Sequence, residues 1–110
     1  MLRESYTAIV ERSEELRGDF ATEPYECGWA GEAIFFVRTL EWTGDLEGVT
    51  LRVQISADGI RWCDEGTSVT LGAAEVAFCK VNHFGNWLRL AGRLPDGASL
   101  RSVFALSLKA

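Results

Sequence analysis

The sequence is poor in proline and histidine and contains no long hydrophobic run. Two prolines and one histidine occur in 110 residues. No stretch approaches the roughly 18 apolar residues that a membrane helix needs, so no membrane span is expected. The first residues include Glu4 and Glu11 where a secretory signal would have an apolar run. We therefore expect synthesis in the cytoplasm without a signal peptide.

Cysteine and histidine are too few and too widely spaced for the common metal and catalytic motifs. Cys27, Cys63 and Cys79 form no C-x-x-C pair, and His83 is the single histidine. This argues against a zinc site or another bound cofactor. We expect reduced thiols, with Cys63 and Cys79 as small apolar residues in strands, although a bridged pair remains open. His83 has no recognisable nucleophile beside it, so we do not expect an enzyme.

Negative charge predominates and lies mainly in the first half of the chain. The net charge is −5, with eleven acids and four bases in residues 1–50 and five acids and seven bases in residues 51–110. Nucleic-acid binding needs a cluster of Lys or Arg, which the sequence lacks. The asymmetry fits either head-to-tail association or acids that simply keep the protein soluble.

A strict alternation of apolar and polar residues predicts β-structure. Every second residue from Val49 to Ile55 is apolar, and Asp58-Gly59 favours a turn directly afterwards. Similar signals predict further strands at 5–11, 32–42, 60–64, 75–82, 87–94 and 99–109. Residues 66–74 are expected to form a loop, with a short edge strand at 68–71 as an option. This spacing predicts one antiparallel β-sandwich domain over 1–110, jelly-roll-like and all-β, with about eight strands.

The first twenty residues fit two structures. A heptad spacing suits an amphipathic helix and connects Leu2, Tyr6, Ile9, Leu16 and Phe20. Residues 6–10, however, have a strand-like composition. We favour a strand over 5–11 and keep the helix as the alternative.

Alternation along 87–94 places one tryptophan on the outer side of its sheet. Trp87 falls opposite Leu88 and Leu90 and on the same side as Arg89 and Arg93. An outward tryptophan on a sheet indicates either a ligand platform or a contact between subunits. We favour the contact.

A second outward strip belongs to the last strand, where Val103 and Ala105 lie between charged residues. If this strand neighbours 87–94, the two strips merge into an apolar patch with an arginine rim, as is typical of interfaces. The run 32–42 is apolar on both faces and adds two further candidates. The interface candidates are Trp87, Arg89, Arg93, Val103, Ala105, Phe35 and Val37.

Tryptophan content also supports an alternative function, a carbohydrate-binding module. Sugar sites use exposed aromatic faces framed by polar groups. The ligand-binding candidates for this alternative are Trp29, Trp42 and Trp62.

The segment VQISADGIRW, residues 53–62, resembles the V-x-x-S-x-D-G-x-x-W hairpin of discoidin-like (galactose-binding-like) jelly rolls. Residues 84–90, FGNWLRL, and the alternating last strand resemble the later strands of those domains. The resemblance covers residues 49–108 and implies a jelly-roll β-sandwich. It carries over no binding residue, because the chain has no counterpart of their long ligand-binding loops.

Short β-sandwiches with an S-x-D-G-x-W hairpin also resemble small structural proteins of phages and prophages. That resemblance implies a non-catalytic protein that self-associates or decorates a larger assembly, such as a virion shell or fibre. The expected partners are further copies of the chain or a shell or fibre protein, with a glycan as the ligand of the alternative.

Overall fold

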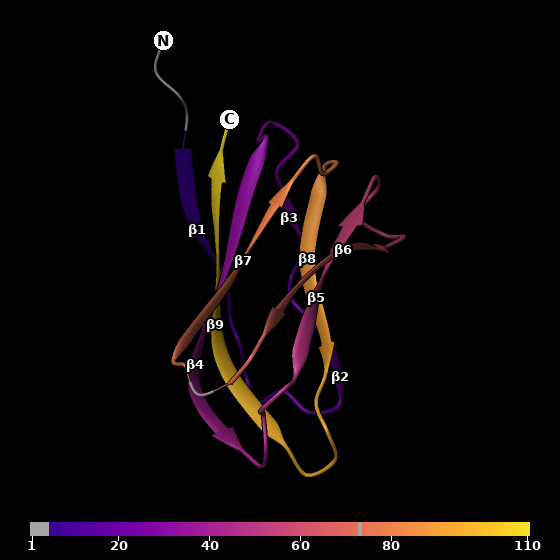
Figure 1. Cartoon of the computed structure of the whole chain (residues 1–110). Helices are drawn as coiled ribbons and strands as arrows, with labels where there is room; N and C mark the ends of the chain where they lie inside the picture. Colours follow the sequence, from indigo (N-terminus) through magenta and orange to yellow (C-terminus); the bar gives the residue numbers. More distant parts are fainter. Residues whose placement is uncertain (1–4, 73) are drawn as a thin grey trace.

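Nine strands and no helix form in residues 5–72 and 74–110, which the computed structural model describes. The expected all-β antiparallel sandwich is confirmed (Figure 1). The strands are β1 (Ser5–Arg12), β2 (Asp19–Ala21), β3 (Tyr25–Glu26), β4 (Glu32–Thr43), β5 (Thr50–Ser56), β6 (Cys63–Thr70), β7 (Val76–Asn82), β8 (Trp87–Arg93) and β9 (Ser99–Lys109).

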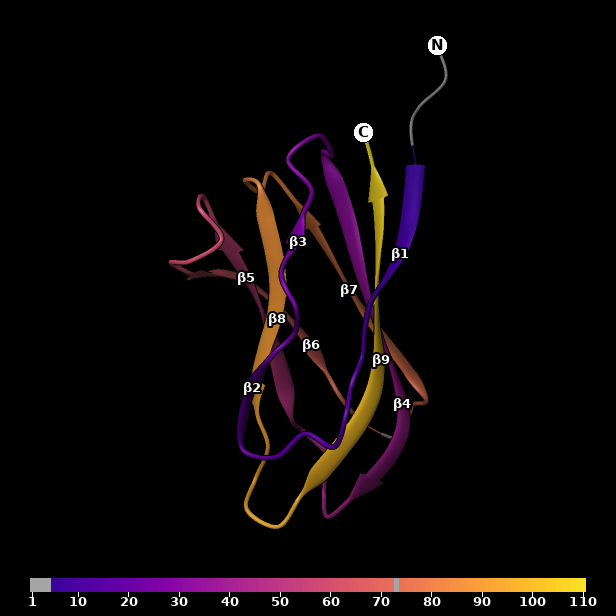
Figure 2. The same ribbon diagram turned by 180° about the vertical axis from the view of Figure 1, so that it is seen from behind.

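The strands form two sheets that face each other (Figures 1 and 2). Sheet A has the order β1-β9-β4-β7, and sheet B has the order β2-β8-β5-β6, with β3 also paired to β8. Because β2 and β3 pair with successive parts of the same edge of β8, they share one strand position. If β2 and β3 are counted together as strand 2, β4 to β9 become strands 3 to 8. Sheet A then has the order 1-8-3-6 and sheet B the order 2-7-4-5, which is the connectivity of a jelly roll.

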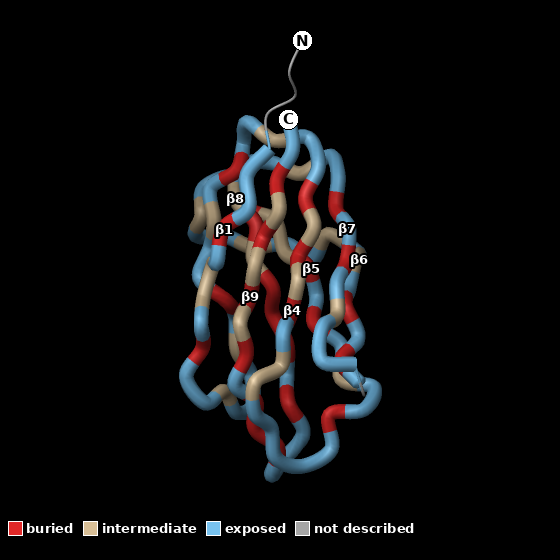
Figure 3. Tube along the Cα trace, turned by 90° about the vertical axis from the view of Figure 1, so that its left-hand side faces the viewer, coloured by how far each residue is buried: buried red, intermediate tan, exposed pale blue. Residues whose placement is uncertain are grey.

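The core lies between the sheets and is built by alternate residues of each strand. Buried and more exposed positions alternate along most of β9 and along residues 32–37 of β4 (Figure 3). The largest fully buried side chains come from both sheets and include Phe35, Val37, Leu51, Val53, Leu88, Leu90, Leu100, Phe104, Leu106 and Leu108.

The N-terminal segment is a strand, as favoured from its composition. β1 pairs antiparallel with β9, and Ala8 packs into the interior opposite Leu106. The helix alternative is wrong for residues 5–20, because the backbone of this segment pairs with β9 up to Leu16 and with β8 from Asp19 onward. Leu2 and Glu4, which entered the sequence argument, lie outside the described residues.

The strand after the Asp58-Gly59 turn starts later and runs further than expected. Cys63 is the first residue of β6 and pairs with Ile55, so residues 57–62 form a loop. The expected strand at 60–64 and loop at 66–74 are therefore wrong in their boundaries, since β6 continues to Thr70. The optional edge strand at 68–71 corresponds to the end of β6, which lies at the edge of sheet B. Residue 73, within that expected loop, lies outside the described residues.

Candidate interaction surfaces

The outward side chains of sheet A form an apolar row across all four strands. Ile9 in β1 pairs with Ala105 in β9. Ala105 pairs on its other side with Phe36 in β4, and Phe36 pairs with Phe78 in β7. Neighbouring rows add three more apolar residues. We call the set the apolar outer face: Ile9, Ile34, Phe36, Val76, Phe78, Val103 and Ala105.

Much of this face is in contact with water. Ile9 is 64% exposed, Phe78 57% and Val76 47%. The rings of Phe36 and Phe78 lie side by side, with their centroids 6.2 Å apart. Strand spacing of about 4.8 Å and a rise of about 3.3 Å per residue give the face an area on the order of 400 Å². Contiguous patches of that size on a monomer are often functional.

Charged side chains border the apolar outer face. Along β4 the outward residues run from Glu32 through Ile34 and Phe36 to Arg38. Arg38 Nε lies 3.3 Å from a carboxylate oxygen of Glu75. An apolar centre with a charged rim is the usual composition of a protein interface.

Two of the seven predicted interface residues lie on this face, two lie in the core and three lie on the other sheet. Val103 and Ala105 face outward and are half-buried. Phe35 and Val37 are each 1% exposed and belong to the core, so their assignment to an outer interface is wrong. The residues of β4 that face outward are the alternate ones, and Phe36 is one of them. Sequence alternation could not decide this because β4 is apolar on both faces.

Trp87 lies on the other sheet. β8 belongs to sheet B and β9 to sheet A, so the strand pairing expected to merge their outer strips is wrong. Trp87 is half-buried and is covered by Gly59, where an added Cβ would lie 3.1 Å from the indole. Gly59 also has a φ of +78°, which favours glycine. Arg93 is exposed, with Nε 3.8 Å from Asp19.

Asp58 organises the loop that covers Trp87. The backbone N–H groups of Arg61 and Ile60 donate to its Oδ1 at 2.9 and 2.8 Å. These bonds, with a smaller contribution from Ser56, lower the pKa of Asp58 to about 2. The carboxylate is thus ionised at neutral pH and is used in holding the loop.

The outer side of sheet B bears a polar network. The guanidinium of Arg89 lies 4.2 Å from the ring centroid of Trp62. Arg89 Nε donates to Gln54 Oε1 at 2.7 Å, and Gln54 Nε2 donates to Asp64 Oδ1 at 2.9 Å. Partial burial lowers the pKa of Arg89, which nevertheless stays charged at neutral pH. Within this network the polar groups bond to one another.

The three tryptophans of the carbohydrate-binding alternative are not gathered in one place. Trp29 precedes β4 and is 45% exposed, whereas Trp42 lies near the end of β4 and is 60% exposed. A strand of twelve residues spans about 40 Å, so these two lie at opposite ends of the sandwich. Trp62 belongs to the loop after β5 and stacks with Arg89.

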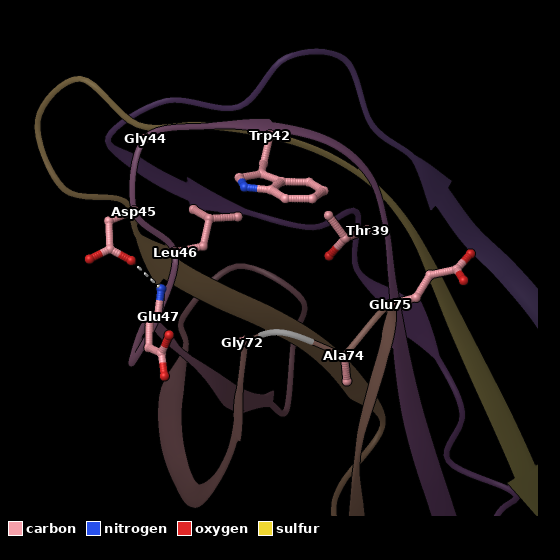
Figure 4. A pocket seen from close by; sticks show the side chains of 9 residues that line it. All are labelled: Thr39, Trp42, Gly44, Asp45, Leu46, Glu47, Gly72, Ala74 and Glu75. Atoms are coloured by element: carbon pink, nitrogen blue, oxygen red, sulfur yellow. Dashed lines mark hydrogen bonds between the residues drawn. The ribbon is translucent and has the colours of Figure 1, made fainter.

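A hollow of about 280 Å³ lies beside Trp42 at the end of the sandwich (Figure 4). Its lining residues are Thr39, Trp42, Gly44, Asp45, Leu46, Glu47, Gly72, Ala74 and Glu75. Leu46 is buried and anchors the loop after β4. Gly44 starts this loop with a φ of +77°, and a Cβ there would lie 2.9 Å from Ala98 Cα. Asp45 Oδ1 accepts the backbone N–H of Glu47 at 2.9 Å.

The three thiols are free and differ in their environments. Cys27 and Cys79 are buried, and desolvation raises the pKa of each to about 11. Cys63 is exposed at the start of β6, so the expectation of a buried Cys63 is wrong.

Other chemical groups are dispersed. His83 is an exposed turn residue with a φ of 52°. In the described part of the chain, no group of three or more His, Cys, Asp or Glu residues is placed to hold a metal ion. No helix there is long and apolar enough to cross a membrane.

These features define a small jelly-roll β-sandwich with an apolar outer sheet face. A family model described as "Domain of unknown function (DUF6385)" matches residues 39–102, more than half of the chain, and the chain belongs to this family. The matched segment runs from the end of β4 into β9 and includes Trp42. Searches of curated proteins and of solved structures found no match. The resemblance to discoidin-like domains therefore stays a prediction.

Proposed function

We propose that this protein is a non-catalytic assembly protein whose apolar outer face binds the same face of a second copy. The observation that supports this is the apolar row from Ile9 to Phe78 across sheet A. A monomer leaves these side chains in water, and burying apolar surface is favourable by roughly 25 cal/mol per Å². Sheets pack face to face through such rows, about 10 Å apart.

The order of residues along β4 suits pairing with itself. If the two-fold axis lies between the two faces and is perpendicular to the strands, β4 of one copy is antiparallel to β4 of the other. Glu32 of one copy would then lie opposite Arg38 of the other, and Ile34 opposite Phe36. Each contact occurs twice, and opposite charges meet at both ends of the apolar centre.

The size of the face favours a dimer of moderate affinity. A standard interface buries about 800 Å² per partner, and the apolar outer face with an area on the order of 400 Å² would form its centre. We expect a dissociation constant on the order of micromolar, because the remaining rim is charged and its burial contributes less binding free energy than burial of apolar surface.

The second copy is the partner that the face itself favours. A role in a larger viral or prophage-derived assembly, such as a virion, rests on the sequence resemblance alone. The carbohydrate-binding alternative is not favoured, because Trp29, Trp42 and Trp62 do not form one platform.

The test is the solution mass of wild type and two charge variants, measured by analytical ultracentrifugation over a wide concentration range. Phe78→Glu places a carboxylate within the apolar outer face, beside Phe36 at the β7 end of the row. Ile60→Glu is the matched control, because Ile60 is 76% exposed and lies in the β5–β6 loop on the other sheet. We expect a wild-type dimer, at least a tenfold weaker dimer for Phe78→Glu, and no change for Ile60→Glu.

Circular dichroism of both variants at the same concentrations checks that they are folded. Wild type that stays monomeric up to millimolar concentration would contradict the proposal. Equal dimerisation of Phe78→Glu and wild type would contradict it as well, because the association would then use another surface.

A further inference from the structure

Sheet A ends at β1, whose outer edge is open. β1 pairs with β9 on one side and is the outermost strand of its sheet (Figure 2). Among the described residues, the backbone of residues 5–10 forms strand hydrogen bonds with β9 alone. An edge strand directs every second N–H and C=O away from its sheet, and these groups can pair with another strand.

The other three edges of the sandwich carry features that discourage such pairing. In sheet B, β2 and β3 form one edge and have only three and two residues. β6 forms the other edge and contains Asp64, Glu65 and an irregular register opposite Val53. In sheet A, β7 contains the exposed Lys80 and lies beside β6 of the other sheet. Short strands, bulges and charged residues are the usual ways of protecting an edge.

β1 lacks these features over residues 5–10. This stretch, SYTAIV, has no charge, proline or glycine and has a strand-like composition. Tyr6 on its inner side is 52% exposed, and Ile9 on its outer side is 64% exposed. A bulge after Ile9 ends the regular register, and Glu11 beyond the bulge accepts the backbone N–H of Glu23 at 2.8 Å. The open, regular part of the edge therefore ends at Ile9.

We propose that β1 pairs antiparallel with β1 of a second copy, so that two copies of sheet A form one continuous sheet. A two-fold axis perpendicular to the sheet, midway between the two Thr7 residues, would place Ser5 of one copy opposite Ile9 of the other. The outer faces of both copies then lie on the same side of the joined sheet, because residues an even number apart share a face. The outward backbone groups of the regular edge thereby gain partners.

The apolar outer face favours a second copy over a foreign strand. Edge pairing would bring two such faces, each on the order of 400 Å², onto one surface of about 800 Å². That is the area that one partner buries in a standard interface. Ile9 of each copy lies beside the junction and continues the apolar row across it. This area argument rests on the proposed face-to-face dimer, whereas the open edge does not.

The test measures edge pairing in protein that lacks the face contact. Phe78→Glu should form a dimer in sedimentation equilibrium, with a dissociation constant on the order of 0.1–1 mM. By NMR, the outward amides of residues 5–9 should exchange with deuterium at least twofold more slowly at millimolar than at micromolar concentration. A face-to-face dimer leaves these edge amides in water, so their protection reports on the edge alone.

Two lysine substitutions in the Phe78→Glu protein separate the edge from the surface around it. Thr7→Lys places like charges opposite each other at the centre of the edge pair and should weaken this dimer at least threefold at low salt. Ser107→Lys is the matched control, because Ser107 pairs with Thr7 and faces the same side but lies one strand further in. Both substitutions remove the same hydrogen bond between the two hydroxyls. Ser107→Lys should change the dissociation constant less than twofold.

Each possible failure has its own signature. If Phe78→Glu stays monomeric at millimolar concentration, or its edge amides exchange equally at both concentrations, the edge pairing is overturned and a face-to-face dimer of wild type is unaffected. If wild type and Phe78→Glu dimerise equally, with the edge amides protected, the edge is supported and the face is contradicted. Equal weakening by Thr7→Lys and Ser107→Lys would overturn β1 as the pairing strand.

Discussion

The three cysteines show how the local environment of a side chain determines its reactivity. Cys27 and Cys79 are enclosed by the core, and loss of solvation raises their pKa to about 11. A thiol with that pKa is roughly 0.1% thiolate at pH 8, and the thiolate is the reactive form. Cys63 lies at the exposed start of β6.

We therefore predict that a thiol reagent such as 5,5′-dithiobis(2-nitrobenzoate) labels a single cysteine in the folded protein. Cys63 should react within minutes, and Cys27 and Cys79 should react only when denaturant opens the core. Absorbance counts the released groups, and a Cys63→Ser variant should show none under native conditions. Rapid release of two or three groups from the folded wild-type protein would contradict the burial of Cys27 and Cys79.

At the scale of elements, the edge of β8 is covered by two short strands with a gap between them. Thr22 lies in this gap and is 4% exposed. Its backbone N–H donates to the carbonyl of Leu90 at 2.8 Å, and its Oγ1 accepts the N–H of Leu90 at 3.0 Å. The hydroxyl thus continues the strand pairing where the backbone of this segment turns away.

Thr22→Val should destabilise the fold by about 1–3 kcal/mol, because it leaves the buried N–H of Leu90 without an acceptor. Thr22→Ser keeps the hydroxyl and should cost about 1 kcal/mol or less. Urea unfolding followed by circular dichroism measures both free energies. If valine is tolerated as well as serine, the side-chain bond contributes nothing to stability.

Across the whole molecule, strand pairing joins distant parts of the sequence. β1 pairs with β9, and the hydroxyl of Thr7 donates to that of Ser107, 100 residues away. Each sheet likewise combines strands from both halves of the chain. Folding must therefore close long loops before these contacts form.

This topology predicts slow folding. Refolding after dilution from denaturant should occur on a scale of milliseconds to seconds, as in other antiparallel sandwiches. Stopped-flow tryptophan fluorescence, begun from monomeric protein, gives the rate. A main phase in the microsecond range would show that local structure dominates folding, in contrast to the pairing of β1 with β9.

The sequence by itself determined where most strands form. A period of two identified β5, β8 and β9 to within a residue or two at each end, and composition identified β1. It also predicted the outward side of β9: Val103 and Ala105 face outward, and the alternate residues Phe104 and Leu106 are buried. These features follow from neighbours in sequence, because side chains alternate along any strand.

The tertiary structure decided which of two apolar faces is inside and which strands are neighbours. Phe35 and Phe36 are alike in sequence, yet only the face with Phe35 meets the second sheet. The patch expected around Trp87 was divided between two sheets, while Ile9 and Phe78 were brought onto one face. The reason is that sheet membership depends on pairings between residues far apart in the chain, and a local pattern of alternation does not contain them.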